Sequence, residues 1–528
     1  MFIRFFGIVG LTKDTVRTGI AVLALLVTAG CVRLAAPQEM DWSSHYGSSV
    51  IGEGFDTIAE RYLEPVSASD LALHGLGGLR TVDAGLTFDV DKAALIVRRD
   101  GIEAGRIPAP GPADTAAWSD TTVAAIGIAR NASPALHDAR AERIFRAVFD
   151  GALAPLDRFS RYADAVTATE NRALRDGFGG IGVTIRIEDL HALIIDVSEK
   201  GPARRAGLMP EDRVTHVDGQ PIAGWTQRQL VDVLRGYVGT PVSLTVERAG
   251  KALAAPVSLV RDHIVPQTVT LHRDGTLAII RISSFNQDTA ARLNDVVAEA
   301  FAQPGPPPTG FVLDMRANPG GLLNRAVEVV DVFAERGQIV ATRGRHQLSI
   351  QSYPAAAGDA TAGRPLVVLI NGNSASAAEV VAAALQDLGR AVIVGTNSFG
   401  KGTVQSVIEL PNDGELTLTW SRLLAPSGYR LHGLGVLPTL CTHGGGADLT
   451  ADSVIGALRN GTLATTGGLA RWRASASNDA PQRLALRNIC PADGSMPTAD
   501  MNVARALIED PVLYSRALRL SGTAIAQR

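Results

Sequence analysis

Two neighbouring segments carry residue types that could activate a serine hydroxyl as a nucleophile. The first, N-G-N-S-A-S-A-A-E (371–379), lies where an apolar run passes into a helical pattern. A serine at such a junction, here Ser376, lies at a helix N-terminus, whose free N–H groups and positive dipole end favour a developing oxyanion. Ser376 and Glu379 also spell a capping box, which needs no catalysis, so this segment alone leaves both interpretations open.

The second segment, T-N-S-F-G-K-G-T-V-Q (396–405), follows the next apolar run and contains Lys401. Loops after consecutive strands on one side of a sheet meet, so Lys401 can approach Ser376. A desolvated lysine has a depressed pKa and can take the serine proton. Chain geometry permits Gln405 to point back at Lys401 and to orient it by a hydrogen bond.

The lysine segment also nearly spells a phosphate-binding loop, G-x-x-x-x-G-K-[ST]. Gly402 stands where Ser or Thr would hold magnesium, and the pattern that follows is strand-like rather than helical. Nucleotide binding is therefore not expected.

A third segment, V-L-D-M-R-A-N-P-G-G-L-L (312–323), again passes from a strand through a turn into a helix. The N–H groups of Gly320 and Gly321 are free there to face a ligand. The alternative is a tight turn that simply needs glycines, with Arg316 and Asp314 as a structural ion pair.

These segments require elements that hold them, and the pattern predicts an α/β layer structure over 266–440. Residues 41–165 have mostly helical spacing, interrupted by the breaker I-P-A-P-G-P (107–112). Residues 441–528 contain a glycine-rich stretch and then helical patches, and form a C-terminal extension to which the pattern assigns no role.

Between these regions, residues 176–262 read as short strands with one helix. G-F-G-G-I-G-V (177–183), followed by K-G-P-A-R-R-A-G-L-M-P-E-D-R-V-T-H-V-D-G (200–219), resembles a PDZ domain. Its glycine-rich loop would offer backbone N–H groups to the terminal carboxylate of a peptide, and the adjacent strand edge and helix leave a groove for an added strand. The peptide-binding residues predicted on this basis are Gly179, Gly180, Ile181, Gly182 and Val183.

The N-terminus indicates export. Basic residues precede an uncharged run that ends in V-T-A-G-C (27–31), a layout similar to a bacterial lipoprotein signal over residues 1–31, with Cys31 lipidated. The alternatives are an uncleaved anchor and an ordinary signal cut near Ala29. In an oxidising compartment we expect a disulfide between Cys441 and Cys490, which would contribute roughly 4 kcal/mol in the chain-entropy model, although two buried thiols are the alternative.

The composition excludes several classes of protein. The 50 Lys and Arg residues nearly balance the 53 Asp and Glu residues, which argues against a dedicated nucleic-acid binder. Apolar residues make up 46% of the chain and charged residues 20%, which excludes wholesale disorder. The 10 His and 3 Cys residues are scattered, with no H-E-x-x-H and no C-x-x-C, so no zinc site of common spacing is expected.

Taken together, the segments resemble the carboxyl-terminal processing peptidases, also called tail-specific proteases. The resemblance runs from L-D-R-F-S-R-Y (156–162) through the PDZ-like stretch to G-L-G-V-L-P (433–438), with Ser398 where the family often has Thr. Its most specific marks are S-A-S-A-A-E with A-L-Q-D and F-G-K-G-T-V-Q in register. It implies an α/β multidomain fold, in which a crotonase- or Clp-protease-like layered protease core carries an inserted PDZ domain next to the helical N-terminal region.

The resemblance also implies roles for individual residues. The second serine of S-A-S is the family's nucleophile and corresponds to Ser376. The lysine of F-G-K-G is its general base, here Lys401, and the glutamine four residues later, Gln405, assists. The amide after the nucleophile, here Ala377, and the last glycine of N-P-G-G, here Gly321, form the oxyanion hole.

We therefore predict a serine endopeptidase on the periplasmic side of a bacterial cell envelope, lipid-anchored to a membrane. Its PDZ domain captures the C-terminal tail of a protein or peptide substrate, and hydrolysis needs no metal or organic cofactor. The other partners to consider are an adaptor protein and a second copy of the chain in a homodimer. Nucleic acid is not expected as a partner.

Two other functions are alternatives to this prediction. A non-catalytic PDZ scaffold at the cell envelope would have no need of the intact Ser376, Lys401 and Gln405. The core of the family also resembles the crotonase fold, which suggests an acyl-CoA enzyme as a further alternative. An exported protein would lack acyl-CoA.

Overall fold

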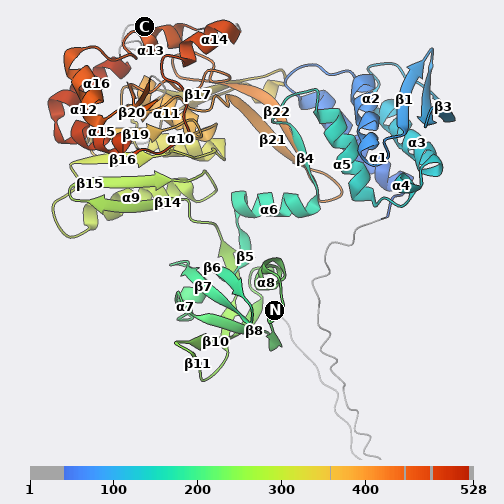
Figure 1. Cartoon of the computed structure of the whole chain (residues 1–528), viewed down its shortest axis with the longest axis horizontal. Coiled ribbons are helices and arrows are strands. Elements are labelled where there is room, and N and C mark those ends of the chain that lie inside the picture. Colours follow the sequence, from blue (N-terminus) through green and yellow to red (C-terminus); the bar gives the residue numbers. More distant parts are fainter. Residues whose placement is uncertain (1–40, 357, 445–446, 476–479, 523–528) are drawn as a thin grey trace, which may run out of the picture. The chain divides into compact units, whose positions relative to one another are not determined.

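The computed structural model describes residues 41–356, 358–444, 447–475 and 480–522 (Figure 1). The predicted signal segment with Cys31 lies outside these residues. Within them, no helix combines the length and the apolar character that crossing a membrane requires.

The core is built on one six-stranded sheet with the strand order β14-β15-β16-β19-β20-β23. The strands are β14 (Val269–Asp274), β15 (Leu277–Ile282), β16 (Gly310–Asp314), β19 (Leu366–Ile370), β20 (Val392–Gly395) and β23 (Leu440–Cys441). From β15 to β23 all neighbours are parallel, so the carboxyl ends of these strands lie at one edge of the sheet. The predicted α/β layer structure is confirmed.

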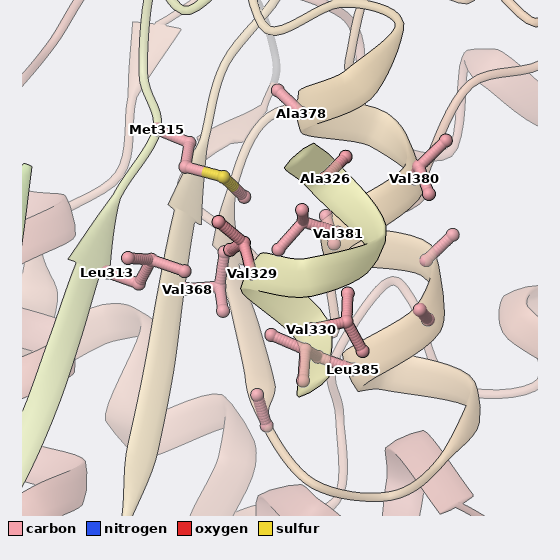
Figure 2. Packing of buried hydrophobic residues seen from close by; sticks show 14 of the residues in the cluster. Leu313, Met315, Ala326, Val329, Val330, Val368, Ala378, Val380, Val381 and Leu385 are labelled. Atoms are coloured by element: carbon pink, nitrogen blue, oxygen red, sulfur yellow. The ribbon is translucent and has the colours of Figure 1, made fainter. Parts of the chain in front are cut away.

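Helices cover both faces of this sheet because its central strands are apolar on both sides. Leu313 and Val368 pack against α10 (Leu323–Asp331) and α11 (Ala377–Asp387), as Figure 2 shows. Their neighbours Val312 and Val367 point to the opposite face and join a second cluster with the C-terminal helices. Every residue of α11 is buried, so the helix that follows Ser376 is fixed along its whole length.

A second sheet has the order β18-β17-β22-β21, with β4 paired to β22. Its strands are β4 (Arg161–Ala163), β17 (Gln338–Arg343), β18 (Gln351–Pro354), β21 (Thr403–Glu409) and β22 (Glu415–Leu424). The turn between β21 and β22 reaches into the N-terminal domain, where Leu410, Leu416 and Leu418 join the apolar core. The N-terminal domain therefore anchors the strand that follows Lys401.

The N-terminal domain is mostly helical, as predicted. Its helices are α1 (Ser44–Arg61), α2 (Ala68–Gly78), α3 (Thr115–Ala132), α4 (Pro134–His137) and α5 (Ala141–Leu153). An unpredicted antiparallel sheet of β1 (Leu86–Asp91), β2 (Ala94–Arg99) and β3 (Ile102–Pro108) interrupts them. The turn from β2 to β3 is made by Asp100 and Gly101, both at positive φ, which is the hairpin signal that sequence reasoning passed over.

The short strands predicted over 176–262 form the expected small β domain. A sheet of the order β11-β10-β8-β7-β6 runs from β11 (Lys251–Ala252) to the edge strand β6 (Val183–Glu188), and α8 (Gln227–Leu234) is the longer of the domain's two helices. Its other long strands are β7 (His191–Val197), β8 (Arg213–Val217) and β10 (Pro241–Arg248). Strand β5 (Phe178–Gly180) pairs with β13 (Asp262–Ile264), so the two ends of the domain lie side by side.

The described part of the C-terminal extension is mostly helical and begins with the short paired strands β24 (His443–Gly444) and β25 (Ala447–Asp448). It contains α12 (Ala451–Asn460), α13 (Gly468–Ala474), α14 (Ala480–Arg487), α15 (Thr498–Glu509) and α16 (Pro511–Gly522). A disulfide joins Cys441, at the end of β23, to Cys490, which follows α14. The covalent link thus runs between the core sheet and the extension.

Candidate active site

Ser376 occupies the turn between β19 and α11. It is the N-cap residue of α11 and has φ 55° and ψ −113°, a conformation that a residue with a side chain rarely adopts. Such strain persists only where the surroundings over-determine the backbone. The serine is partly exposed, whereas Ala375 before it and Ala377 after it are buried, so the turn presents the hydroxyl outward.

The Glu379 carboxylate determines that backbone. It is fully buried and accepts the N–H of Ser376 at 2.7 Å and that of Lys401 at 2.9 Å through one oxygen. The other oxygen accepts the Ser398 hydroxyl at 2.5 Å and the Gly400 N–H at 2.6 Å. The acidic half of the predicted capping box is therefore formed, but the same carboxylate also ties the serine turn to the lysine loop.

Lys401 lies in a desolvated position at the end of that loop. Burial lowers the pKa of its ammonium, and the positive charge of Arg161 lowers it further, while Glu379 and Asp157 act in the opposite direction. Its Nζ lies 5.1 Å from the centre of the Phe159 ring. The lysine is therefore easier to deprotonate than a lysine in water.

Ser376 and Lys401 line one cavity of about 440 Å³, together with Ala377 and Gly321. Within the described residues, no hydrogen bond joins the serine hydroxyl to the lysine ammonium. Gln405 lines the same cavity, but its amide donates to the hydroxyls of Thr403 at 2.8 Å and Thr419 at 3.2 Å. The expected hydrogen bond from Gln405 to Lys401 is not present in this structure.

Gly320 packs directly against the serine turn. A Cβ atom on Gly320 would lie 2.8 Å from Ser376 Cβ and 3.0 Å from Ala377 N, so no side chain is tolerated there. Its N–H is not free, because it donates to the Asn318 carboxamide oxygen at 2.8 Å. The prediction that Gly320 offers its N–H to a ligand is therefore wrong.

Gly321 is as crowded as Gly320 but differs from it in its N–H group. It has φ 145° and lies so close to Phe285 that a Cβ would approach the Phe285 carbonyl oxygen to 2.1 Å. In the part of the chain that the structure describes, the N–H groups of Gly321 and Ala377 make no hydrogen bond. They are the two amides that remain available to an oxyanion beside Ser376.

Arg316 and Asp314 form the structural ion pair that was the alternative for this segment. The guanidinium binds both oxygens of Asp314 at 2.9 Å, and Arg316 also contacts Asp500 at 2.9 Å. All three side chains are buried. Arg316 therefore supports the loop and does not face the cavity.

The sequence did not reveal that Glu379 bridges the serine turn and the lysine loop. It also did not reveal that the segment around Asp157 lies under Lys401. Asp157 accepts the N–H groups of Phe159 and Ser160, and also the Thr419 hydroxyl at 3.1 Å. This turn holds the Phe159 ring beneath the lysine. The motif L-D-R-F-S-R-Y was the available signal, but nothing in its pattern assigned a role to any of its residues.

The small β domain carries a second cavity, between the edge strand β6 and α8. The residues 180–183 line it on one side, with Val231 and Leu234 on the other. The Gln227 amide binds the Ile185 carbonyl and the Ile187 N–H, which closes the far part of the strand edge. The open part of the edge lies next to the glycine-rich loop.

Gly179 does not line this groove, unlike the other predicted peptide-binding residues. Its carbonyl accepts the N–H of Gly236, and the two backbones are in contact. Arg235 lines the groove instead, with its guanidinium 4.1 Å from the centre of the Phe178 ring. Among the described residues Arg235 forms no ion pair, so its charge is available to an anionic ligand.

In the described parts of the chain, no group of three or more His, Cys, Asp or Glu side chains is arranged to hold a metal ion.

Two family matches cover the regions that hold these cavities. Residues 276–441 match peptidase family S41, and residues 179–259 match the PDZ domain.

Individual proteins extend these matches. The carboxy-terminal-processing protease of Bartonella bacilliformis is 38% identical over 301 residues, which cover 57% of this chain and 69% of that protein. A probable CtpA-like serine protease of Staphylococcus saprophyticus is 31% identical over 307 residues, covering 57% of this chain and 61% of that protein. The solved structure of a photosystem II D1 C-terminal processing protease is 23% identical and covers 76% of this chain and 92% of its own, with a TM-score of 0.36.

The bridging role of Glu379 predicts a kinetic effect of Glu379→Gln. A carboxamide has one acceptor oxygen, so at least two of the four hydrogen bonds are lost. Loss of one charge-assisted hydrogen bond costs about 1.5–3 kcal/mol, so we expect the turnover number to fall about tenfold to a hundredfold. Cleavage of β-casein, an unstructured protein, measures this.

The matched control is Glu328→Gln on the neighbouring helix α10, where the carboxylate is partly exposed and, among the described residues, pairs with Arg325 alone. It should keep the turnover number of the unsubstituted protein. A turnover number for Glu379→Gln equal to that of the control would contradict the bridging role.

Proposed function

Because the chain belongs to the carboxy-terminal-processing proteases of peptidase family S41, we propose that Ser376 is its nucleophile and Lys401 its general base. The chain is a serine-type endopeptidase with a PDZ domain, so the predicted enzyme class is confirmed. Family membership speaks against the non-catalytic scaffold.

One observation supports the proposed roles of Ser376 and Lys401. A strained serine at the N-terminus of a buried helix shares a cavity with a lysine whose pKa is lowered by burial. Each feature is costly by itself, since the strain costs about 1–3 kcal/mol and burying an ammonium is unfavourable. Together they supply a nucleophile and a neutral base.

The reaction follows from these positions. Neutral Lys401 accepts the proton of the Ser376 hydroxyl as the serine oxygen attacks the substrate carbonyl. The N–H groups of Ala377 and Gly321 then hold the negative oxygen of the tetrahedral intermediate. Lys401 then gives the proton to the leaving amine as the peptide C–N bond breaks, which leaves the acyl-enzyme. A water molecule gives a proton to Lys401 and attacks the acyl carbonyl, and Lys401 returns this proton to the Ser376 oxygen as the ester bond breaks.

Gln405 assists this cycle as a positioning residue. Its amide nitrogen is held by Thr403 and Thr419, and Thr419 in turn donates to Asp157. The carboxamide oxygen of Gln405 is thereby left to accept a hydrogen bond from the protonated form of Lys401.

The PDZ domain selects substrates by their C-terminal tails. A tail would extend along β6, with its terminal carboxylate at the loop of residues 180–183. The unpaired guanidinium of Arg235 next to that loop supports an anionic ligand there. Free C-termini of proteins and peptides are therefore the proposed recognition element.

We also propose that the mature protein is tethered through Cys31 to a membrane of a bacterial cell envelope, on its periplasmic side. The support is the sequence pattern V-T-A-G-C at residues 27–31.

The dyad predicts that Ser376→Ala and Lys401→Ala each abolish cleavage of β-casein while leaving the melting temperature unchanged, and that Gln405→Ala lowers the rate less. Since the base must be neutral, the rate rises with pH through the pKa of Lys401, which burial places below the free value of about 10.4. The pH dependence of kcat/KM between pH 6 and 10 measures it.

The charge of Arg161 provides the control for this pH profile. Arg161→Gln removes a positive charge that lowers the pKa of Lys401, so the rising limb should move to higher pH. Arg161→Lys keeps the charge and should leave the limb in place. Full activity of Lys401→Ala would refute the dyad.

The tail-recognition proposal predicts different kinetics for free-acid and C-terminally amidated forms of one peptide substrate. Amidation removes a charge-assisted contact worth about 1.5–3 kcal/mol, so KM should rise about tenfold to a hundredfold while kcat stays constant. Arg235→Gln should reduce the difference between the two forms. Equal KM values for both forms in the unsubstituted protein would show that the carboxylate is not recognised.

The anchor predicts that Cys31→Ser releases the protein from the membrane fraction or stops its maturation. Fractionation of cells that express either form, with the mass of the mature N-terminus, measures this. An unchanged membrane fraction for Cys31→Ser would argue for an uncleaved anchor.

A further inference from the structure

The segment between α14 and α15 crosses the carboxyl edge of the core sheet. Residues 487–500, called the strap, comprise the last residue of α14, the irregular segment 488–497 and the first three residues of α15. The strap lies beyond residues 276–441, where the peptidase family match ends. It contacts the loops after β16, β19 and β20 in turn.

The serine loop is bound to the strap by backbone contacts. The N–H of Gly372 donates to the Asp493 carbonyl at 2.6 Å, and the two backbones are so close that a Cβ on Gly372 would lie 2.9 Å from the Asp493 carbonyl oxygen. The buried Asn371 amide donates to the carbonyls of Gly494 and Ser495, both at 3.0 Å. The turn that presents Ser376 therefore starts from a point held by the strap.

The lysine loop is held at three successive residues. The Thr396 hydroxyl donates to the Asp493 carbonyl at 3.0 Å, and the Asn397 amide donates to the Arg487 carbonyl at 2.8 Å. The Arg487 side chain donates to the Ser398 carbonyl at 3.0 Å and to the Leu434 carbonyl at 2.6 Å.

Arg487 also balances the charge inside the site. It is half-buried, and burial lowers the pKa of its guanidinium while the negative charge of Glu379 raises it. Glu379 binds Ser398 and the N–H groups of Gly400 and Lys401 from one side of the lysine loop. Arg487 binds the carbonyl of Ser398, so the loop is held by both an anion and a cation.

The loop after β16 is the third loop that contacts the strap. Arg316 donates to the Pro497 carbonyl at 3.2 Å and pairs with Asp500, which is 1% exposed. This loop leads to Gly321. One segment of the chain therefore contacts the loops of all three groups of the proposed chemistry.

The disulfide locks the strap in place. Cys490 lies within the strap and is fully buried, and its Sγ lies 3.7 Å from the carbonyl oxygen of Gly395, the last residue of β20. Its partner Cys441 pairs in β23 with Gly395. The link thus fastens the strap at the root of the lysine loop.

We propose that the strap is a positioning device for the Ser–Lys dyad, with Arg487 as the positioning residue of the lysine loop and the Cys441–Cys490 disulfide as its lock. This inference rests on the proposed function of Ser376 and Lys401. If the strap only covered the edge of the sheet, it would contribute to the stability of the folded protein alone. If the strap positions the dyad, it also sets the turnover number.

The first test compares Arg487→Gln and Arg487→Lys with the unsubstituted full-length protein. Since small displacements of catalytic groups cost up to about a hundredfold in rate, we expect Arg487→Gln to lower kcat about tenfold to a hundredfold with KM unchanged. Arg487→Lys keeps the charge but donates from one nitrogen where Arg487 donates from two, and should recover part of the rate. Amide hydrogen exchange at Gly400 and Lys401 should be faster in Arg487→Gln.

The matched control is Arg505→Gln in the same extension, where the guanidinium pairs with Asp274 at the surface. It should leave kcat unchanged. If Arg487→Gln keeps the kcat of this control, or if its kcat falls only in proportion to lost folded protein, the strap does not position the dyad.

The lock is tested with the double variant Cys441→Ala/Cys490→Ala and by reduction of the unsubstituted protein. Dithiothreitol transfers two electrons and two protons to the disulfide, which leaves two thiols and a cyclic disulfide of the reagent. Both treatments should lower kcat, and dithiothreitol should have no further effect on the double variant. A kcat unchanged in both would overturn the lock.

The variants distinguish failure of the strap proposal from failure of the proposed Ser376–Lys401 dyad. Should Lys401→Ala remain active while Arg487→Gln is slow, the proposed base is wrong and the strap acts on another group. Should Lys401→Ala be inactive and Arg487→Gln fast, the dyad stands and the strap proposal falls. If the double cysteine variant does not fold, Arg487→Gln and the reduced protein decide the matter.

Discussion

The geometry of the proposed catalytic site depends on one buried carboxylate. Glu379 lies inside the first turn of α11 and accepts hydrogen bonds from the serine turn and from the lysine loop at once. Burial raises the pKa of this carboxyl group, while its four donors lower it. Because a buried acceptor without donors is costly, each loop is held in the conformation that keeps its N–H groups directed at Glu379.

The same burial that strengthens the hydrogen bonds of Glu379 disfavours the charged form of Lys401. Both groups lose water, but Glu379 recovers hydrogen bonds from the backbone, whereas Lys401 faces an aromatic ring and the positive charge of Arg161. Desolvation therefore favours the neutral form of the lysine. A single low-polarity region thus holds Glu379 in position and favours the neutral form of Lys401 that the proposed base requires.

Three separate parts of the chain converge on this region. The N-terminal part supplies Phe159 beneath Lys401 and anchors the β21–β22 hairpin through Leu410, Leu416 and Leu418. The core sheet supplies the parallel strands whose carboxyl ends carry the loops. The extension supplies Arg487 and the rest of the strap. Groups far apart in sequence therefore hold the loops from opposite sides, which local structure alone could not do.

What the sequence by itself determined is the local framework. Apolar runs alternating with helical patterns predicted the α/β core, and a serine at a strand–helix junction with a lysine after the next strand predicted the dyad. Parallel strands place such loops at one edge whatever the rest of the chain does. Only the tertiary structure decided that the Gly320 N–H is taken by Asn318, that Gln405 turns to Thr403, and that residues 487–500 brace the loops. These choices rest on contacts between distant segments, whose partners no local pattern specifies.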